Sequence, residues 1–333
     1  MAKLAKFVAA LALGASVAGF AVVDAAARDR TPAAPAAPAT PPVSRPFVAA
    51  YQPTNAAITA QNWAAADTAL VALKAAATTP YEHFLAAQTE FRIASAQNLA
   101  DRQYTALNAM IDSNGAPVAD QPRLYTAGGQ LAYNNRQYAV AADRLKRALE
   151  LGSTTEDLQL LRLDSLFKSN QTDVALTEGR AMIATADAAG THVPENVYSI
   201  MARSLQEANR NADLTSILLQ RAVAYPSAFN FRSAGLFYLQ TAPQNRGENI
   251  DILRLLLAAD AMNERRFYVE HVTNLADEGL PNEALTTIAA GRAARLIPTP
   301  DRTFDEVSAS QTAKLAEDRA SLVSGERTAR TRY

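Results

Sequence analysis

Histidines are the first side chains to consider for metal or acid–base chemistry. The chain has three, far apart in the sequence: His83, His192 and His271. None belongs to an HExxH motif, in which two histidines one helical turn apart bind zinc. Buried or surface histidines without a catalytic role explain them better, and the sequence predicts no metal site.

One short motif has the spacing of a catalytic pair. Ser165 and Lys168 stand three residues apart, as in penicillin-binding enzymes, where the lysine activates the serine. The companion SDN and KTG motifs are missing from the sequence, and the four residues are expected to end a helix just before KSNQ. We therefore interpret the match as coincidental.

Carboxylates are plentiful and scattered. Glu82, Glu90 or Asp164 could act as a lone acid, as in lytic transglycosylases with a helical superhelix, but no lysozyme-like domain is recognisable to hold one. GxSxG, Walker and GxGxxG motifs are also missing, and the chain has no cysteine for thiol chemistry or disulfides. We predict no catalytic, cofactor-binding or metal-binding residues and a protein that is not an enzyme.

Composition favours an all-α protein. Hydrophobic residues make up 49% of the 333 residues, but aromatic residues only 7%, and much of the apolar content is alanine. Alanine-rich segments favour close helix packing over sheets of β-branched and aromatic residues. The net charge of −1 gives no general attraction to nucleic acid or to an anionic membrane.

The first 27 residues have the order of a secretory signal peptide. Lys3 and Lys6 precede an apolar or small stretch over residues 7–23, and Ala25–Ala27 offer a cleavage site. A retained membrane anchor is the alternative, because about 17 residues are near the lower limit for spanning a bilayer. Membrane contact is expected only if this helix is not cleaved.

A Pro/Ala-rich segment over residues 28–49 follows and is expected to be a disordered, extended linker. The excess of Arg over Lys and the abundance of Ala are typical of a GC-rich bacterial genome. We therefore predict a periplasmic protein, with an inner-membrane anchor facing the periplasm as the alternative.

Helical segments separated by short polar sequences fill residues 50–298, and the clearest unit is residues 122–153. Its first helix carries Tyr125 and then two glycines, Gly128 and Gly129, where helices must approach closely. Tyr138 opens a second helix, one face of which carries residues at spacings of three and four: Ala141, Leu145, Ala148 and Leu149.

This unit resembles the tetratricopeptide repeat, which the more degenerate neighbouring units follow loosely. The residues aligned with Tyr138 are expected to open the second helix of each pair: Trp63, Tyr104, Thr172, Ala212, about Asn249 and Pro281. The intervals are roughly 41, 34, 34, 40, 37 and 32 residues, against about 34 in the family. Small residues recur where helices cross: Ala66, Ala141, Ala175 and Ala284.

The resemblance implies a right-handed α-solenoid of antiparallel helix pairs over residues 50–298. Residues 299–333 are expected to form a capping helix, or to start a further repeat, with a frayed tail. An unrelated helical bundle is the competing interpretation of the fold.

In this family the first helix of each pair lines a concave groove, which implies these candidate binding residues: Arg92, Arg123, Gln130, Tyr133, Asn134, Asp164, Phe167, Lys168, Ser204 and Glu207. Polar and aromatic side chains on such a surface suit an extended peptide or glycan. The lysine and asparagine set with which chaperone-binding members hold a C-terminal carboxylate is missing, so that ligand is disfavoured.

The expected function is that of a periplasmic scaffold or adaptor that binds a protein or an extended peptide in a bacterial cell-envelope assembly. A component of exopolysaccharide synthesis or export, with a polysaccharide partner, is the first alternative. The second is the non-catalytic superhelical region of a peptidoglycan hydrolase. No nucleic-acid partner is expected.

Overall fold

The computed structural model describes residues 41–153, 157–241 and 245–332, and these residues form helices without any β-strand. The prediction of an all-α chain is therefore confirmed. The expected signal peptide, residues 1–27, and the linker up to residue 40 lie outside the described residues. The helices are α2 (Arg45–Thr59), α3 (Trp63–Ala76), α4 (Pro80–Ala96), α5 (Ala100–Asp112), α6 (Gln121–Asn134), α7 (Tyr138–Glu150), α8 (Leu158–Lys168), α9 (Thr172–Ala188), α10 (Glu195–Glu207), α11 (Asn211–Ala224), α12 (Ala228–Thr241), α13 (Arg246–Ala258), α14 (Arg265–Asp277), α15 (Pro281–Ala293) and α16 (Arg302–Arg332).

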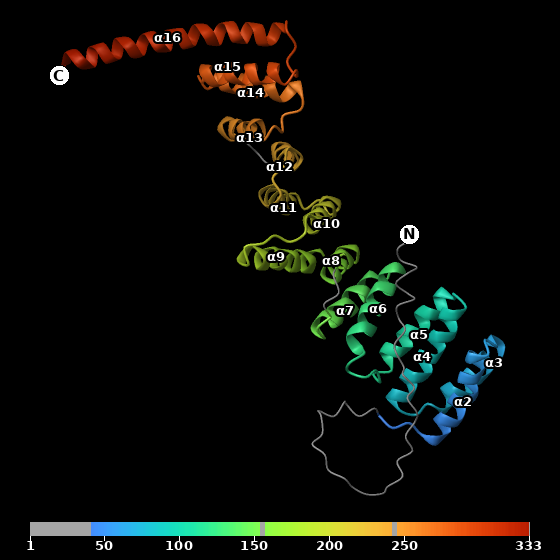
Figure 1. Cartoon of the computed structure of the whole chain (residues 1–333). Helices are drawn as coiled ribbons and strands as arrows, with labels where there is room; N and C mark the ends of the chain where they lie inside the picture. The colour runs from blue at the N-terminus through green and yellow to red at the C-terminus, as the bar shows by residue number, and fades with distance from the viewer. Residues whose placement is uncertain (1–40, 154–156, 242–244, 333) are drawn as a thin grey trace, which may run out of the picture. The chain divides into compact units, whose positions relative to one another are not determined.

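The chain divides into two compact units, residues 1–178 and 179–333, with the boundary inside α9. In the first unit α2 packs against α3, α4 against α5 and α6 against α7, and each pair packs on the next through α3–α4, α5–α6 and α7–α8 (Figure 1). The second unit repeats this order with the pairs α10–α11, α12–α13 and α14–α15. Each unit is thus a series of stacked helix pairs, the arrangement expected of tetratricopeptide-like repeats.

A shared turn joins the helices of six pairs. Its key residue is left-handed, with φ between 54° and 71°: Gln61, Asn98, Arg136, Asn170, Asn209 and Gly279. At Arg136 the N–H groups of this residue and of Gln137 donate back to the carbonyls of Tyr133 and Ala132, both at 2.9 Å. This is the Schellman ending of a helix, which pairs the last free carbonyls and reverses the chain within two residues.

These turns fix where six second helices begin, at Trp63, Ala100, Tyr138, Thr172, Asn211 and Pro281, and the remaining second helix, α13, begins at Arg246. Most of these positions agree with the sequence prediction within three residues. The prediction for Tyr104 is wrong, because α5 begins one turn earlier, at Ala100. The prediction followed the aromatic side chain, whereas the left-handed Asn98 sets the position of the turn.

Small residues at the helix crossings let the pairs approach closely. The four predicted alanines are fully buried, with 0% exposure: Ala66, Ala141, Ala175 and Ala284. Gly129 in α6 is equally constrained, since a Cβ there would lie 2.6 Å from Cγ of Leu145 in α7. In the second pair Gln103 takes the alanine position, and its amide donates to the carbonyl of Ala94 at 3.4 Å.

The first helix begins earlier than expected, inside the stretch 28–49 assigned to the linker. Ser44 caps α2 by accepting a hydrogen bond from the backbone N–H of Phe47, and Pro46 stands in its first turn. Phe47 is buried among the residues of α2, α3 and α4. Its burial anchors α2 to the rest of the first unit.

The second unit ends on α16, which is longer than every other described helix. Its N-terminal part packs on α14 and α15, and the buried Phe304 joins the core of those helices. Asp301, which precedes α16, pairs with Arg265 of α14 at 2.8 Å. Within the described ranges, no helix is both long enough and apolar enough to cross a bilayer.

Candidate functional site

The structure keeps the three histidines apart. His83 is exposed on α4, and His192 is exposed in the connection before α10, 3.4 Å from Asp187. His271 is fully buried in α14, and neither ring nitrogen has a hydrogen-bond partner among the described residues. Nor does the part of the chain that the structure describes contain three or more histidine or acidic side chains grouped as a metal site would need.

Ser165 and Lys168 do not form a nucleophile–base pair. The Ser165 hydroxyl is buried and donates to the carbonyl of Leu161 at 2.6 Å, within its own helix. The Lys168 ammonium instead donates to the Tyr133 hydroxyl and lies 2.6 Å from Oδ2 of Asp164. The residues of this motif therefore serve packing and a different polar cluster.

That cluster, which we call the tyrosine–lysine cluster, consists of Tyr133, Tyr138, Asp164 and Lys168. The Lys168 ammonium lies 4.6 Å from the ring centroid of Tyr133 and 5.4 Å from that of Tyr138. The two rings meet edge to face, with centroids 5.4 Å apart and an interplanar angle of 66°. The Tyr133 hydroxyl donates to Asp164, so one carboxylate holds both the phenol and the ammonium.

Local structure explains why these four residues meet. Tyr133 lies in the last turn of α6 and Tyr138 is the first residue of α7, so the tight turn at Arg136 brings their rings together. Asp164 and Lys168 are four residues apart on α8, one above the other on a single helix face. The packing of α6 against α8 joins the two halves of the cluster.

Burial and charge shift two of the groups in the cluster. Burial is the main cause that raises the pKa of the Tyr133 hydroxyl, and the neighbouring Asp164 adds to the rise. Burial pushes the pKa of Lys168 down, but its interactions with Asp164 and Tyr133 outweigh this effect and raise it. The phenol is therefore neutral and the ammonium charged at neutral pH, and with the Asp164 carboxylate the cluster has no net charge.

The structure thus brings together three of the predicted groove residues, Tyr133, Asp164 and Lys168. Phe167 is buried, with 6% exposure, and presents little surface to a ligand. The other candidates in the first unit lie on α4 and α6: Arg92, Arg123 and Asn134 are exposed and Gln130 is half-buried. Ser204 and Glu207 lie on α10 in the second unit, the former half-buried and the latter exposed.

Sequence reasoning missed Tyr138 as a member of this site. It used Tyr138 only to mark the start of a second helix. The available signal was its position five residues after Tyr133, across a turn short enough to return the chain on itself.

The carboxylates considered as lone acids have structural partners. Glu82 is fully buried, and burial would raise its pKa, but backbone and hydroxyl hydrogen bonds from Ser44 and Thr78 lower it to about 2. Glu90 pairs with Lys74 at 2.5 Å and with Arg102 at 3.3 Å. Both carboxylates therefore tie helices together.

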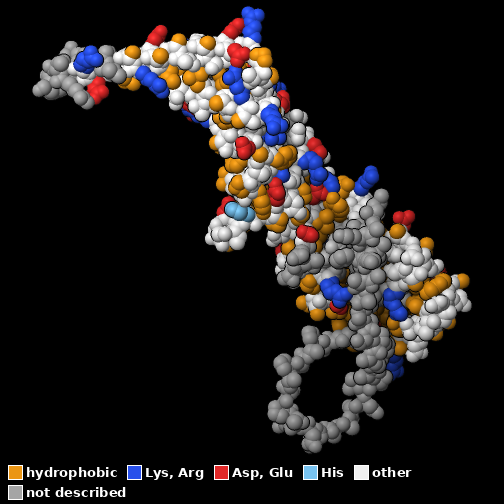
Figure 2. Space-filling model, turned by 45° about the horizontal axis from the view of Figure 1, so that its top comes forward, with side chains coloured by type: hydrophobic (Ala, Val, Ile, Leu, Met, Phe, Trp, Pro, Cys, Tyr) orange, Lys and Arg blue, Asp and Glu red, His pale blue; other side chains and the backbone are white. Residues whose placement is uncertain are grey.

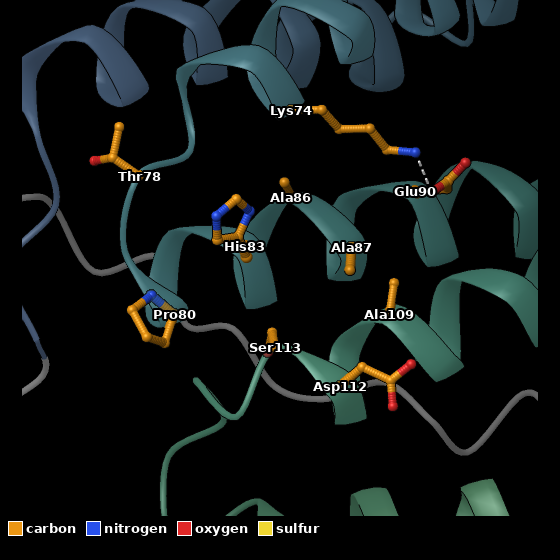
Figure 3. Close-up of a pocket in the computed structure, with 10 residues that line it drawn as sticks. All are labelled: Lys74, Thr78, Pro80, His83, Ala86, Ala87, Glu90, Ala109, Asp112 and Ser113. Carbon is orange, nitrogen blue, oxygen red and sulfur yellow. Dashed lines mark ion pairs between the residues drawn. The ribbon is translucent and has the colours of Figure 1, made fainter.

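A pocket of about 630 Å³ lies between α3, α4 and α5 (Figure 3). Ala86 and Ala87 of α4 line it beside His83, but both side chains are almost fully buried, with 3% and 4% exposure, and their methyl groups point to different sides of the helix. Lys74 of α3 stands on one side and Asp112 of α5 on the other. The pocket shares no residue with the tyrosine–lysine cluster.

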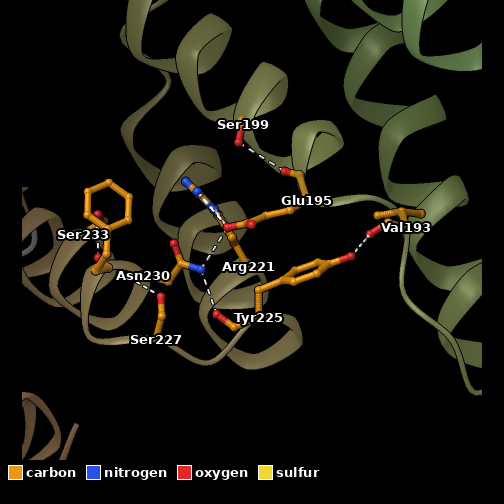
Figure 4. Close-up of polar contacts among 9 residues, drawn as sticks. Val193, Glu195, Ser199, Arg221, Tyr225, Ser227, Asn230 and Ser233 are labelled. Carbon is orange, nitrogen blue, oxygen red and sulfur yellow. Dashed lines mark hydrogen bonds and ion pairs between the residues drawn. The ribbon is translucent and has the colours of Figure 1, made fainter. Parts of the chain in front are cut away.

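The second unit contains a separate polar network (Figure 4). Arg221 of α11 donates to Glu195 of α10 at 2.8 and 3.0 Å, and the Asn230 amide of α12 donates to the same carboxylate at 3.1 Å. These hydrogen bonds, from Asn230 first and then Arg221, lower the pKa of Glu195. Tyr225 donates to the carbonyl of Val193 at 2.7 Å, so the network fixes the connection before α10.

On the face that Figure 2 shows, basic and acidic side chains are interspersed among hydrophobic ones. No large patch of a single charge appears on that face. Interspersed charges of both signs give a surface no strong general attraction to a polyanion.

No protein-family model matches this sequence, and no curated protein matches it. Among solved structures, similarity is found to tetratricopeptide-repeat proteins at low identity. The C-terminal part of a repeat protein from Cytophaga hutchinsonii is 13% identical, with a TM-score of 0.36, over 77% of this chain and 98% of that one. The TPR2AB domain of yeast Sti1, in a pHSP90 complex, is 10% identical, with a TM-score of 0.35, over 80% and 98%. YrrB, a TPR protein with an unusual peptide-binding site, is 16% identical, with a TM-score of 0.34, over 55% and 87%.

Proposed function

We propose that this chain is a binding scaffold that holds an extended segment of a protein partner on the first helices of its pairs. The observation that supports this most is the tyrosine–lysine cluster. It places two half-buried aromatic rings and a charged ammonium at one point on the helices α6–α8. Aromatic rings supply contact area at low entropic cost, and they anchor many protein interfaces.

The charge of the cluster favours a peptide over an anionic ligand. Asp164 lies 2.6 Å from the Lys168 ammonium and neutralises it, so no uncompensated positive charge is available to a carboxylate or phosphate. Beside the cluster, α6 offers the amides of Gln130 and Asn134. A side-chain amide donates and accepts at once and can therefore pair with a peptide group.

We extend the proposal to a location in the bacterial periplasm and a partner in the cell envelope. This part is supported by the signal-like order of residues 1–27. Expression of the full chain in a bacterial host, followed by fractionation and mass spectrometry of its N-terminus, tests it. A cytoplasmic chain with an intact N-terminus would refute the proposed location.

Site-specific photocrosslinking tests the groove. A photoreactive phenylalanine that replaces Asn134 should crosslink a defined partner in envelope extract, and mass spectrometry identifies that partner. The control has the photoreactive phenylalanine in place of Asp143, an exposed residue of α7. Tyr133→Ala in the Asn134 variant should reduce the yield by about tenfold, as expected for an aromatic anchor at a binding surface. Equal crosslinking from both positions, or no effect of Tyr133→Ala, would refute the proposed groove.

A further inference from the structure

The pocket between α3, α4 and α5 lies beside a position of α4 that has a small side chain where α6 has a large one. Counted from the turn residues Asn98 and Arg136, Ala87 of α4 is equivalent to Tyr125 of α6. The Tyr125 ring packs against the hydrophobic cores on both sides of α6. Ala87 is itself buried in the core between α4 and α5, and the exposed part of the pocket lining beside it is made by His83, Ala109 and Asp112 (Figure 3).

The charges around the pocket are unevenly compensated. Lys74 is paired with Glu90 at 2.5 Å. Arg102, which also contacts Glu90, is paired with Asp67 at 2.6 Å, so these two cations and two carboxylates cancel. Asp112 is exposed at the opposite rim and has no ion-pair partner among the described residues. The uncompensated charge of the pocket is therefore negative, and the complementary ligand group is a cation.

The shape and lining favour arginine over other cations. The exposed methyl group of Ala109 accepts the aliphatic stem of a long side chain, whose charged end then reaches the rim. The exposed ring of His83 lines the pocket and offers a flat surface to a guanidinium group, which stacks on such faces. A guanidinium group also matches a carboxylate with two parallel hydrogen bonds, and Asp112 supplies that carboxylate.

We propose that this pocket binds an arginine side chain presented by an extended segment of a partner protein. The stem lies against Ala109, and the guanidinium group pairs with Asp112 beside His83. The volume of about 630 Å³ exceeds one side chain, so the residues next to the arginine also enter the pocket. This site is independent of the tyrosine–lysine cluster and does not depend on the function proposed for it.

A titration with short peptides tests the proposal on the full chain. The probes are capped Ala-Ala-Arg-Ala-Ala and two versions in which citrulline or glutamate replaces the arginine. The methyl NMR signals of Ala86 and Ala87 report binding. We expect the arginine peptide to shift them saturably, with a Kd on the order of 1 mM, and the neutral citrulline peptide to bind at least about fivefold more weakly.

Variants locate the site. Asp112→Asn should weaken arginine binding by about fivefold or more, and Asp143→Asn, at an exposed position of α7, should not change it. Ala109→Leu fills the pocket from an exposed position of α5 and should abolish binding without loss of the helical circular dichroism signal. Tyr133→Ala should leave arginine binding unchanged, which separates this site from the proposed groove.

Several outcomes would overturn the proposal. They are the absence of saturable shifts up to about 20 mM peptide, equal affinity for the citrulline peptide, and an unchanged Kd in Asp112→Asn. Preferential binding of the glutamate peptide would identify an anion pocket around Lys74 instead, and would also overturn it.

Discussion

His271 should make the second unit sensitive to acid. The side chain is fully buried in α14, and neither ring nitrogen has a partner among the described residues. Burial is the main cause that lowers the pKa of His271 to about 4. Glu283 raises this pKa and Arg254 lowers it, and both effects are smaller than that of burial. These two neighbours form an ion pair at 2.6 Å, so their influences on the imidazole partly cancel.

The sign of the effect follows from the two states. The unfolded chain protonates His271 below about pH 6.5, while the folded chain keeps it neutral down to about pH 4. The unfolded state therefore binds more protons between these values, and the stability falls as the pH falls through this window. At pH 5 the loss relative to neutral pH is on the order of 2 kcal/mol, and below about pH 4 this group causes no further loss.

Hydrogen exchange resolves this effect in the second unit. The single tryptophan, Trp63, lies in the first unit, so its fluorescence does not report on α14. The exchange of backbone amides in peptides from α14 and α15 is measured by mass spectrometry. We expect the free energy of opening of these helices to fall by about 2 kcal/mol between pH 7 and pH 5.

His271→Leu should remove most of this pH dependence. It should also keep or slightly raise the stability at pH 7, because it removes two unpaired nitrogen atoms. His192→Leu, at an exposed site, is the control and should keep the wild-type slope. If His271→Leu and the wild type lose stability equally between pH 7 and pH 5, the reasoning from burial is wrong.

Two further substitutions test the packing of the first unit by urea unfolding, monitored by tryptophan fluorescence. Gly129→Ala should destabilise it by about 1–3 kcal/mol, because the new methyl group would lie 2.6 Å from Cγ of Leu145; an unchanged midpoint would show that these helices can separate at little cost. Glu178→Gln should lower the free energy of unfolding by about 2 kcal/mol, because it removes the carboxylate that accepts two hydrogen bonds from the buried Arg162. The control is Glu150→Gln, in an exposed ion pair, which should change the free energy of unfolding by less than about 0.5 kcal/mol. Equal effects of the two glutamate substitutions would refute the distinction between buried and exposed pairs.

The helical class and the crossing positions were predictable because they depend on local patterns. Alanines at Ala66, Ala141, Ala175 and Ala284 recur where only a small side chain lets two helices meet, and all four are buried. The start of α5 was not predicted correctly, since it depends on the left-handed Asn98 and not on the aromatic Tyr104.

The candidate site was predictable only in part. The repeat pattern placed Tyr133, Asp164 and Lys168 on first helices, but it could not show that a single carboxylate would hold both the phenol and the ammonium. The pattern also could not show that Phe167, one turn away, points into the core. Such distinctions depend on how α6, α7 and α8 pack.

By itself, the sequence determined the helical repeats and the near-neutral charge balance, because each of these is a property of local composition and periodicity. Only the tertiary structure decided which polar groups compensate one another. It paired Lys168 with Asp164 beside two tyrosine rings, left Asp112 without an ion-pair partner among the described residues at the rim of a pocket, and buried His271. These outcomes depend on distances between side chains that are far apart in the sequence, and packing alone sets those distances.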